Sequence, residues 1–226
     1  MILMKPIVAI FSADWFFFVA FSYTVSKGGE RMETIDWSKL TPEERVEQYA
    51  IENYKHGLNC AECVLSALQR EGALDIPKEA VGMGVGFGGG IGLSGLTCGA
   101  LSAAVLANGL RYGRKDPYTV PAEERGKEVA GKYYRRYHAL VREFVAENGS
   151  PTCAEISAPH GEWESRERRI HCLQLIGRAA RLAYRYLQMP QDEAFALPYE
   201  GKTMKQFDGA KPETLPYPTP HLVIRK

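Results

Sequence analysis

The chain has 226 residues, of which 45% are hydrophobic and 24% are charged, and its formal net charge at pH 7 is +1. This composition is ordinary for a globular protein with a buried core, and the balanced charge excludes the strongly basic proteins that bind nucleic acid by electrostatic attraction. We interpret the short basic run at residues 166–169, which contains an acid, as a solvated helix face. Five cysteines are an odd number, which is not typical of a secreted disulfide-rich domain and favours a reducing compartment such as the cytoplasm.

Residues 1–31 differ in character from the rest of the chain. Residues 6–25 are apolar and follow Lys5, as in a signal or anchor segment, but Asp14 would cost about 2.5–3.5 kcal/mol at the centre of a membrane span. Residues 27–32 can be encoded by a nucleotide sequence that holds a bacterial ribosome-binding site before a start codon. We therefore predict that translation begins at Met32, that residues 1–31 are an upstream leader, and that the protein without them has no membrane association.

The hydrophobic pattern after Met32 is helical nearly throughout, which predicts an all-α fold. The first helix follows the N-cap Thr41 and Pro42, with Glu44 placed for a capping box, and ends at residues 56–57. The same pattern predicts four further helices, at about residues 59–70, 98–112, 121–148 and 163–188. Residues 32–188 should therefore form one compact domain of about five helices.

Two segments of the chain are not expected to form α-helix. Residues 81–99 hold nine of the 22 glycines and are predicted to form a loop in which backbones approach closely. Residues 189–226 contain repeated prolines, so we predict an extended C-terminal arm from Pro190 onward.

Three cysteines lie where helices are predicted to begin. Asn59 and Thr152 each precede a cysteine and are followed three positions later by glutamate, as in a capping box, and Thr97 precedes Cys98 without the glutamate. Cys60, Cys98 and Cys153 would each occupy a first helical position, where free N–H groups and the helix dipole favour an anion such as a thiolate. Thiolates bind metals and attack disulfides. The placement indicates chemistry, although a free cysteine also serves as a small buried hydrophobic residue.

The remaining candidate residues carry weaker signals. Cys172 lies on the apolar stripe of the last long helix and can meet the other three cysteines only if the helices converge. Cys63 lies about one turn after Cys60 and is interpreted as packing, with a spare ligand or a resolving thiol as alternatives. His56 and His171 are candidate ligands or proton donors, but a surface or capping role is favoured for both.

The cysteine spacing excludes the common metal signatures. A zinc ribbon needs two close cysteine pairs, covalent c-type haem needs a histidine after the second cysteine, and ferredoxin spacings are absent. Any metal centre would therefore have to be assembled from distant segments of the chain.

Four stretches together resemble a known family, namely NCAECVLSAL (59–68), GFGGGIGLSGLTCGALSAA (86–104), NGSPTCAEI (148–156) and HCLQLIGRAA (171–180). They resemble the redox-active family named for its C-GCAxxG-C-C cysteine pattern, over roughly residues 46–187. The resemblance identifies Cys60, Cys98, Cys153 and Cys172 as the four cysteine stations and leaves Cys63 outside the pattern. It implies redox chemistry and, through a related domain of a split-Soret cytochrome, an iron–sulfur centre without haem.

Our leading hypothesis is an electron carrier or oxidoreductase in which Cys60, Cys98, Cys153 and Cys172 are the redox-active residues and bind an iron–sulfur cluster. Backbone N–H groups of the glycine-rich loop would tune the cluster, with the following glycines nearest to it: Gly88, Gly89, Gly90, Gly95 and Gly99. The expected partner is an electron-transfer protein or a small redox molecule, and the apolar helix content is compatible with a homodimer.

Two other functions stay open from the sequence. In a thiol–disulfide oxidoreductase, Cys60 would attack and Cys63 or Cys98 would resolve the mixed disulfide. In a non-catalytic interaction module, the proline-rich arm would contact the partner and the cysteines would be dispensable.

Overall fold

The computed structural model describes residues 35–199, so the predicted leader at residues 1–31 and most of the predicted C-terminal arm lie outside the described residues. The chain divides into two units, Met1–Lys39 and Leu40–Lys226. The described part of the first unit contains one short 3-10 helix, Trp37–Lys39. No helix between residues 35 and 199 has the length and apolar character needed to cross a membrane.

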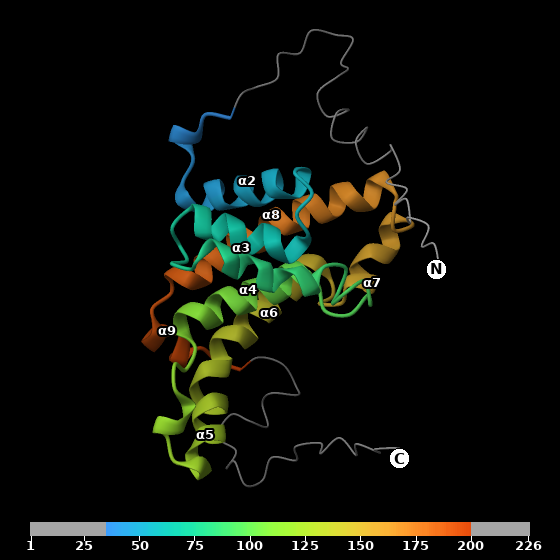
Figure 1. Ribbon diagram of the computed structural model, residues 1–226. Coiled ribbons are helices and arrows are strands. Elements are labelled where there is room, and N and C mark those ends of the chain that lie inside the picture. Colours follow the sequence, from blue (N-terminus) through green and yellow to red (C-terminus); the bar gives the residue numbers. More distant parts are fainter. Residues whose placement is uncertain (1–34, 200–226) are drawn as a thin grey trace, which may run out of the picture. The chain divides into compact units, whose positions relative to one another are not determined.

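The second unit is built from helices, which confirms the prediction of an all-α fold (Figure 1). Between residues 40 and 199 no β-strand occurs, and the only extended pairing is an isolated bridge between Thr97 and Thr152. The long helices of this part of the chain are α2 (Pro42–Lys55), α3 (Cys60–Arg70), α4 (Gly99–Tyr112), α6 (Tyr134–Asn148) and α8 (Arg166–Gln188). A π-helical turn, Val129–Tyr133, joins α5 (Ala122–Glu128) to α6, so the predicted helix at residues 121–148 is continuous. The shorter elements are α7 (Cys153–Ser157), α9 (Gln191–Ala196) and the 3-10 segments Lys78–Phe87, Pro117–Thr119 and Ala158–His160.

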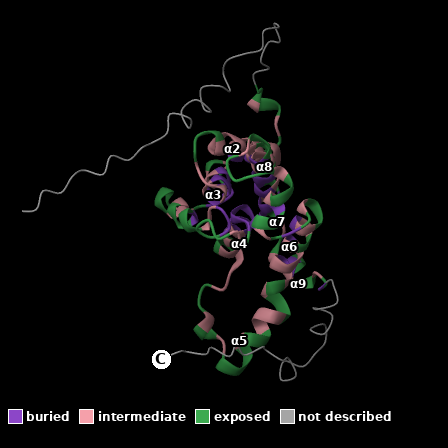
Figure 2. Cartoon of the chain, turned by 90° about the vertical axis from the view of Figure 1, so that its right-hand side faces the viewer, coloured by how far each residue is buried: buried purple, intermediate pink, exposed green. Residues whose placement is uncertain are grey.

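The core lies where α3, α4 and α8 meet, as the distribution of buried residues shows (Figure 2). Small side chains on the facing surfaces, such as Ala104 on α4 and Ala183 on α8, let these two helices approach closely. Asn108 is fully buried between them and donates hydrogen bonds to the carbonyl oxygens of Ala104 (3.1 Å) and Ala183 (3.3 Å). In contrast, α5 has no buried residue.

Two of the predicted capping boxes form, and the start of the last long helix differs from the prediction. The capping boxes at Thr41 and Asn59 are both present, with Glu44 and Glu62 accepting from the cap backbones at 2.8 and 3.0 Å. The last long helix begins at Arg166 and not at the predicted residue 163. The reason is that Ser165 is its N-cap and accepts from the backbone N–H of Arg168 at 3.2 Å.

The expected extended arm is wrong for residues 191–196, which form α9. Pro190 is the residue that precedes this helix, where the N–H that proline lacks would have no intrahelical partner in any case. The prolines at positions 212, 216, 218 and 220 lie outside the described residues.

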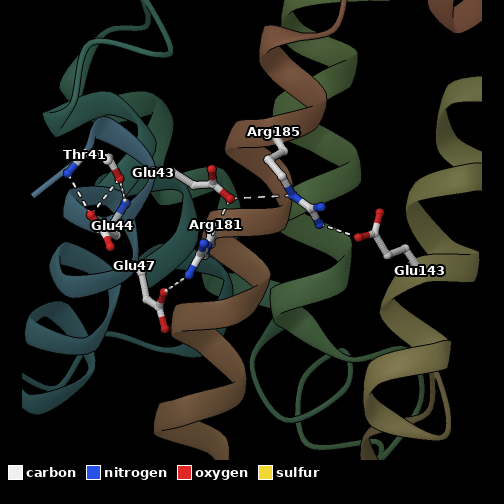
Figure 3. A network of polar contacts seen from close by, with 7 residues as sticks. All are labelled: Thr41, Glu43, Glu44, Glu47, Glu143, Arg181 and Arg185. Carbon is white, nitrogen blue, oxygen red and sulfur yellow. Dashed lines mark hydrogen bonds and ion pairs between the residues drawn. The ribbon is translucent and has the colours of Figure 1, made fainter.

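Ion pairs link α2 to α8 and α8 to α6 (Figure 3). Glu43, in the first turn of α2, contacts Arg181 (2.9 Å) and Arg185 (3.6 Å) near the end of α8, and Arg185 also pairs with Glu143 of α6. Because the start of α2 meets the end of α8, the two helices run antiparallel. The end of α2, with Tyr54, therefore lies beside the start of α8.

Arg136 of α6 secures the end of α8 from within the core. Its side chain is 2% exposed, stacks on the Tyr112 ring at 3.8 Å, and donates to the carbonyl oxygens of Tyr186, Met189 and Pro190. These carbonyls lie at or just beyond the C-terminus of α8, where the helix leaves acceptors unpaired and its dipole favours a cation.

We expect Arg136→Met to lower the free energy of unfolding by about 3 kcal/mol, because it leaves these buried acceptors without their charged donor. Arg142→Met, at an exposed position of the same helix, is the matched control and should change stability little. Urea unfolding followed by circular dichroism measures both. Equal stability of the two variants would contradict this role of Arg136.

Candidate functional site

Four of the five cysteines come together from four different elements. Cys60 is the first residue of α3, Cys98 directly precedes α4, Cys153 is the first residue of α7, and Cys172 lies in the second turn of α8. The sulfur of Cys60 is close enough to interact electrostatically with the sulfurs of the other three, and Cys153 interacts with Cys98 and Cys172. All four are free thiols. We call these four residues the four-thiol site.

A short antiparallel backbone pairing joins the chain before α4 to the chain that begins α7. The N–H of Cys98 donates to the carbonyl of Pro151 at 2.8 Å, and the N–H of Cys153 donates to the carbonyl of Leu96 at 2.6 Å. The N–H of Ala154 adds a third bond, to the carbonyl of Gly95 at 3.0 Å. These bonds place two cysteines, 55 positions apart in the sequence, side by side.

This pairing corrects two predicted caps. Thr97 was expected to cap α4, but it forms the bridge with Thr152, and Cys98 itself is the N-cap residue of α4. The capping box expected at Thr152 does not form, because Glu155 accepts from the Ser150 hydroxyl and that hydroxyl accepts from the Thr152 N–H. Both threonines that were expected to cap a helix therefore take part in the antiparallel bridge instead.

The glycine-rich loop approaches the site as closely as predicted. A β-carbon on Gly90 would lie 2.7 Å from Cβ of Cys153, and one on Gly99 would lie 2.4 Å from Sγ of Cys60. Gly88 lies against Asn59, the cap of α3, and Gly95 lies against Ala154. At Gly90 and Gly99 only hydrogen fits, so these two glycines let the loop and α4 pack directly on the cysteines.

The backbone from Gly89 to Leu93 has positive φ at every residue, between 59° and 72°. Ile91 (φ 65°) and Leu93 (φ 66°) are the exceptional members, since side chains with a β-carbon are strained in this conformation. The loop and its neighbours also leave large apolar side chains exposed around the site: Met83, Val85, Ile91, Leu93, Leu96 and Trp163.

Burial dominates the acidity of the thiols. It raises the pKa of Cys98 from its ordinary value of 9.0 to about 12, and it is the largest cause of the raised pKa of Cys60 and of Cys172. Backbone N–H groups of Gly89 at Cys60, and of Ala100 and Leu101 at Cys98, act in the opposite direction. The expectation that the helix starts favour thiolates is therefore wrong for Cys60 and Cys98, because lost hydration outweighs the N–H groups.

The weaker candidates lie beside the site or away from it. Cys63 is fully buried in the core, and its thiol donates to the carbonyl of Leu58 at 3.4 Å, in agreement with a packing role. His56 is exposed. His171 stacks on the His160 ring, with 3.8 Å between centroids, and burial lowers its pKa.

Sequence reasoning missed three residues near the thiols. Tyr54 interacts electrostatically with Cys172 and Cys60, and burial raises its pKa to about 12. Arg168 is buried, so the interpretation of residues 166–169 as a wholly solvated face is wrong. Trp163 carries the Arg168 guanidinium over its ring at 3.4 Å. The signal for Arg168 was its spacing, because it lies four positions before Cys172 on one helix face.

The fold and the four thiols define a small all-α protein in which four free cysteines from distant segments lie close together. The profile of the family described as "Putative redox-active protein (C_GCAxxG_C_C)" matches residues 58–186, and the chain belongs to this family. A protein of Archaeoglobus fulgidus described as an uncharacterized protein is 30% identical over 139 residues, which cover 62% of this chain and 91% of that protein. No solved structure matches the chain significantly.

We expect Gly99→Ala to disturb the four-thiol site, because the new methyl group would overlap Sγ of Cys60 and the carbonyl oxygen of Phe87. The cost in the free energy of unfolding should be about 1–3 kcal/mol, and the rate at which an aromatic disulfide reagent labels the thiols should rise. Gly86→Ala, whose β-carbon would meet nothing within 4 Å, is the control. The same labelling rate in both variants would show that the contact does not constrain Cys60.

The raised pKa of Cys98 predicts a loss of stability in alkaline solution. The unfolded chain releases this proton near pH 9.0, whereas the folded protein holds it to about pH 12, so the stabilisation is complete below pH 9.0 and is lost as the pH rises through this interval. One such thiol contributes at most about 1.4 kcal/mol per pH unit. Urea unfolding at a series of alkaline pH values measures this effect. The free energy of unfolding should decline less steeply with pH for Cys98→Ala than for the wild type, and equal slopes would contradict the prediction.

Proposed function

We propose that the protein is an electron carrier that binds an iron–sulfur cluster through Cys60, Cys98, Cys153 and Cys172. The observation that carries the proposal is the convergence of four thiols from four elements that are distant in sequence. Membership of a redox-active family supports the same reading. A bound cluster would supply a centre that accepts and donates one electron at a time.

The surroundings of the sulfurs fit such a cluster. Iron–sulfur clusters are held by four cysteine thiolates, and hydrogen bonds from backbone N–H groups to sulfur tune their reduction potentials. The N–H groups of Gly89, Ala100 and Leu101 interact with the sulfurs of Cys60 and Cys98. The glycine-rich loop therefore has a role in the proposal beyond close packing.

The spacing of the donors also bears on the kind of metal centre. Among residues 35–199, no three Cys, His, Asp or Glu side chains lie close enough to hold one metal ion together. Two sulfurs on one tetrahedral ion lie about 3.8 Å apart, because the metal–sulfur distance is about 2.3 Å and the angle between the bonds is about 109°. A cluster distributes its cysteine ligands over several irons, so a wider arrangement of thiols suits it better than it suits a single zinc ion.

Reconstitution tests this proposal. Protein that begins at Met32, incubated without oxygen with ferrous iron, sulfide and a thiol reductant, should become brown and retain iron and acid-labile sulfide after gel filtration. Cys60→Ala, Cys98→Ala, Cys153→Ala and Cys172→Ala should each lower the iron content severalfold, because each removes one ligand.

The matched control is Cys63→Ala, which removes the fifth thiol and should leave the iron content unchanged. Colourless wild-type protein without bound iron would overturn the proposal. Equal iron content in the Cys60→Ala and Cys63→Ala proteins would show that the assigned ligands are wrong.

A thiol–disulfide oxidoreductase is the second candidate, favoured by the proximity of Cys60 to both Cys63 and Cys98. It ranks lower because attack on a disulfide requires a thiolate before the partner reacts, and burial raises the pKa of the proposed nucleophile Cys60. A bound metal, in contrast, itself promotes deprotonation of a coordinating thiol. In either case the thiols must stay reduced, so we propose that the protein works in a reducing compartment. We expect its partner to be another redox protein or a small redox molecule, as the resemblance implies.

A further inference from the structure

Arg168 is a buried cation without an anionic partner among the described residues. Its side chain is 6% exposed, and no carboxylate between residues 35 and 199 forms an ion pair with it. Its Nη1 donates to the carbonyl oxygen of Trp163 at 2.9 Å, while its buried Nε has no hydrogen-bond partner. Burying a charge without a partner is costly, so an arrangement of this kind calls for an anion nearby.

The guanidinium lies on the side of α8 that faces the four-thiol site. Arg168 and Cys172 are four residues apart, which places them on the same face of the helix one turn from each other. Arg168 also interacts electrostatically with both Cys172 and Tyr54. Trp163, on which the guanidinium stacks, would lie 3.0 Å from a β-carbon on Gly89, the residue whose N–H reaches Cys60.

The neighbouring arginines show that this position is special. Arg166 is exposed, and Arg169 pairs with Glu164 at 2.5 Å. Arg136 is also deeply buried, and its Nη atoms donate to carbonyl oxygens at the end of α8, although its Nε has no hydrogen-bond partner either. Of these four arginines, Arg168 is the one that is buried, has an Nε without a hydrogen-bond partner, and lies near the thiols of the four-thiol site.

We propose that Arg168 compensates the negative charge of the cluster bound at the four-thiol site and thereby raises its reduction potential. This inference rests on the proposed function. A cluster held by four thiolates is an anion, and it gains one further negative charge when an external reductant delivers one electron, with no bond made or broken. A fixed buried cation stabilises the more negative, reduced form more strongly than the oxidised form.

The test compares the midpoint potentials of reconstituted variants, measured by titration with dithionite under an inert atmosphere. Arg168→Gln should shift the potential to a more negative value, because it removes the charge and keeps a polar side chain of similar reach. Arg168→Lys retains the charge and should stay close to the wild type. Arg166→Gln, a loss of the same charge at an exposed position two residues away, is the control and should also stay close to the wild type.

The outcomes separate this inference from the proposed function. If the wild type binds iron and sulfide but Arg168→Gln and Arg166→Gln have the same potential, the charge compensation is refuted while the cluster stands. If the wild type binds no iron, both proposals fall. Should Arg168→Gln not fold, as judged by circular dichroism, Arg168→Lys decides, because a fall in its potential despite the retained charge contradicts the proposal and an unchanged potential supports it.

Discussion

The antiparallel backbone pairing between residues 95–98 and 151–154 is the constraint on which the four-thiol site depends. It fixes the start of α4 beside the start of α7 through three main-chain hydrogen bonds. The backbone N–H groups of Cys98 and Cys153 each donate one of these bonds. Main-chain bonds of this kind do not depend on side-chain identity. The glycines complete this arrangement, because the absence of a side chain at Gly90 and Gly99 lets the backbone contact Cys153 and Cys60, respectively.

The helices could be predicted from sequence because their signals are local. Capping boxes at Thr41 and Asn59, and apolar residues at helical spacing, involve neighbours within one or two turns. The caps at Thr97 and Thr152 could not be predicted correctly, since the two threonines form a bridge with each other, far apart in the sequence, and Glu155 accepts from the Ser150 hydroxyl instead of the cap backbone. The same holds for Arg168, whose burial depends on Trp163 and on packing that a local charge pattern does not contain.

The four cysteines illustrate how two physical effects at a helix start can have opposite signs. The free N–H groups favour a thiolate, whereas removal from water favours the neutral thiol, and here burial is the larger effect for Cys60 and Cys98. Sequence reveals the first effect through the cap but gives no measure of the second. The positions of the thiols were therefore more predictable than their protonation.

Because α2 and α8 run antiparallel, the ion pairs between them lie at one end of α8, and Arg168 and the thiols lie at the other end. Arg181, which pairs with Glu43 and Glu47, lies nine residues beyond Cys172, or about 14 Å further along α8. Its partners are partly exposed, so dissolved ions screen them, whereas Arg168, Cys98 and Cys153 are buried. Ionic strength should therefore weaken the ion pairs between these helices at the end remote from the sulfurs more than it affects the buried groups Arg168, Cys98 and Cys153.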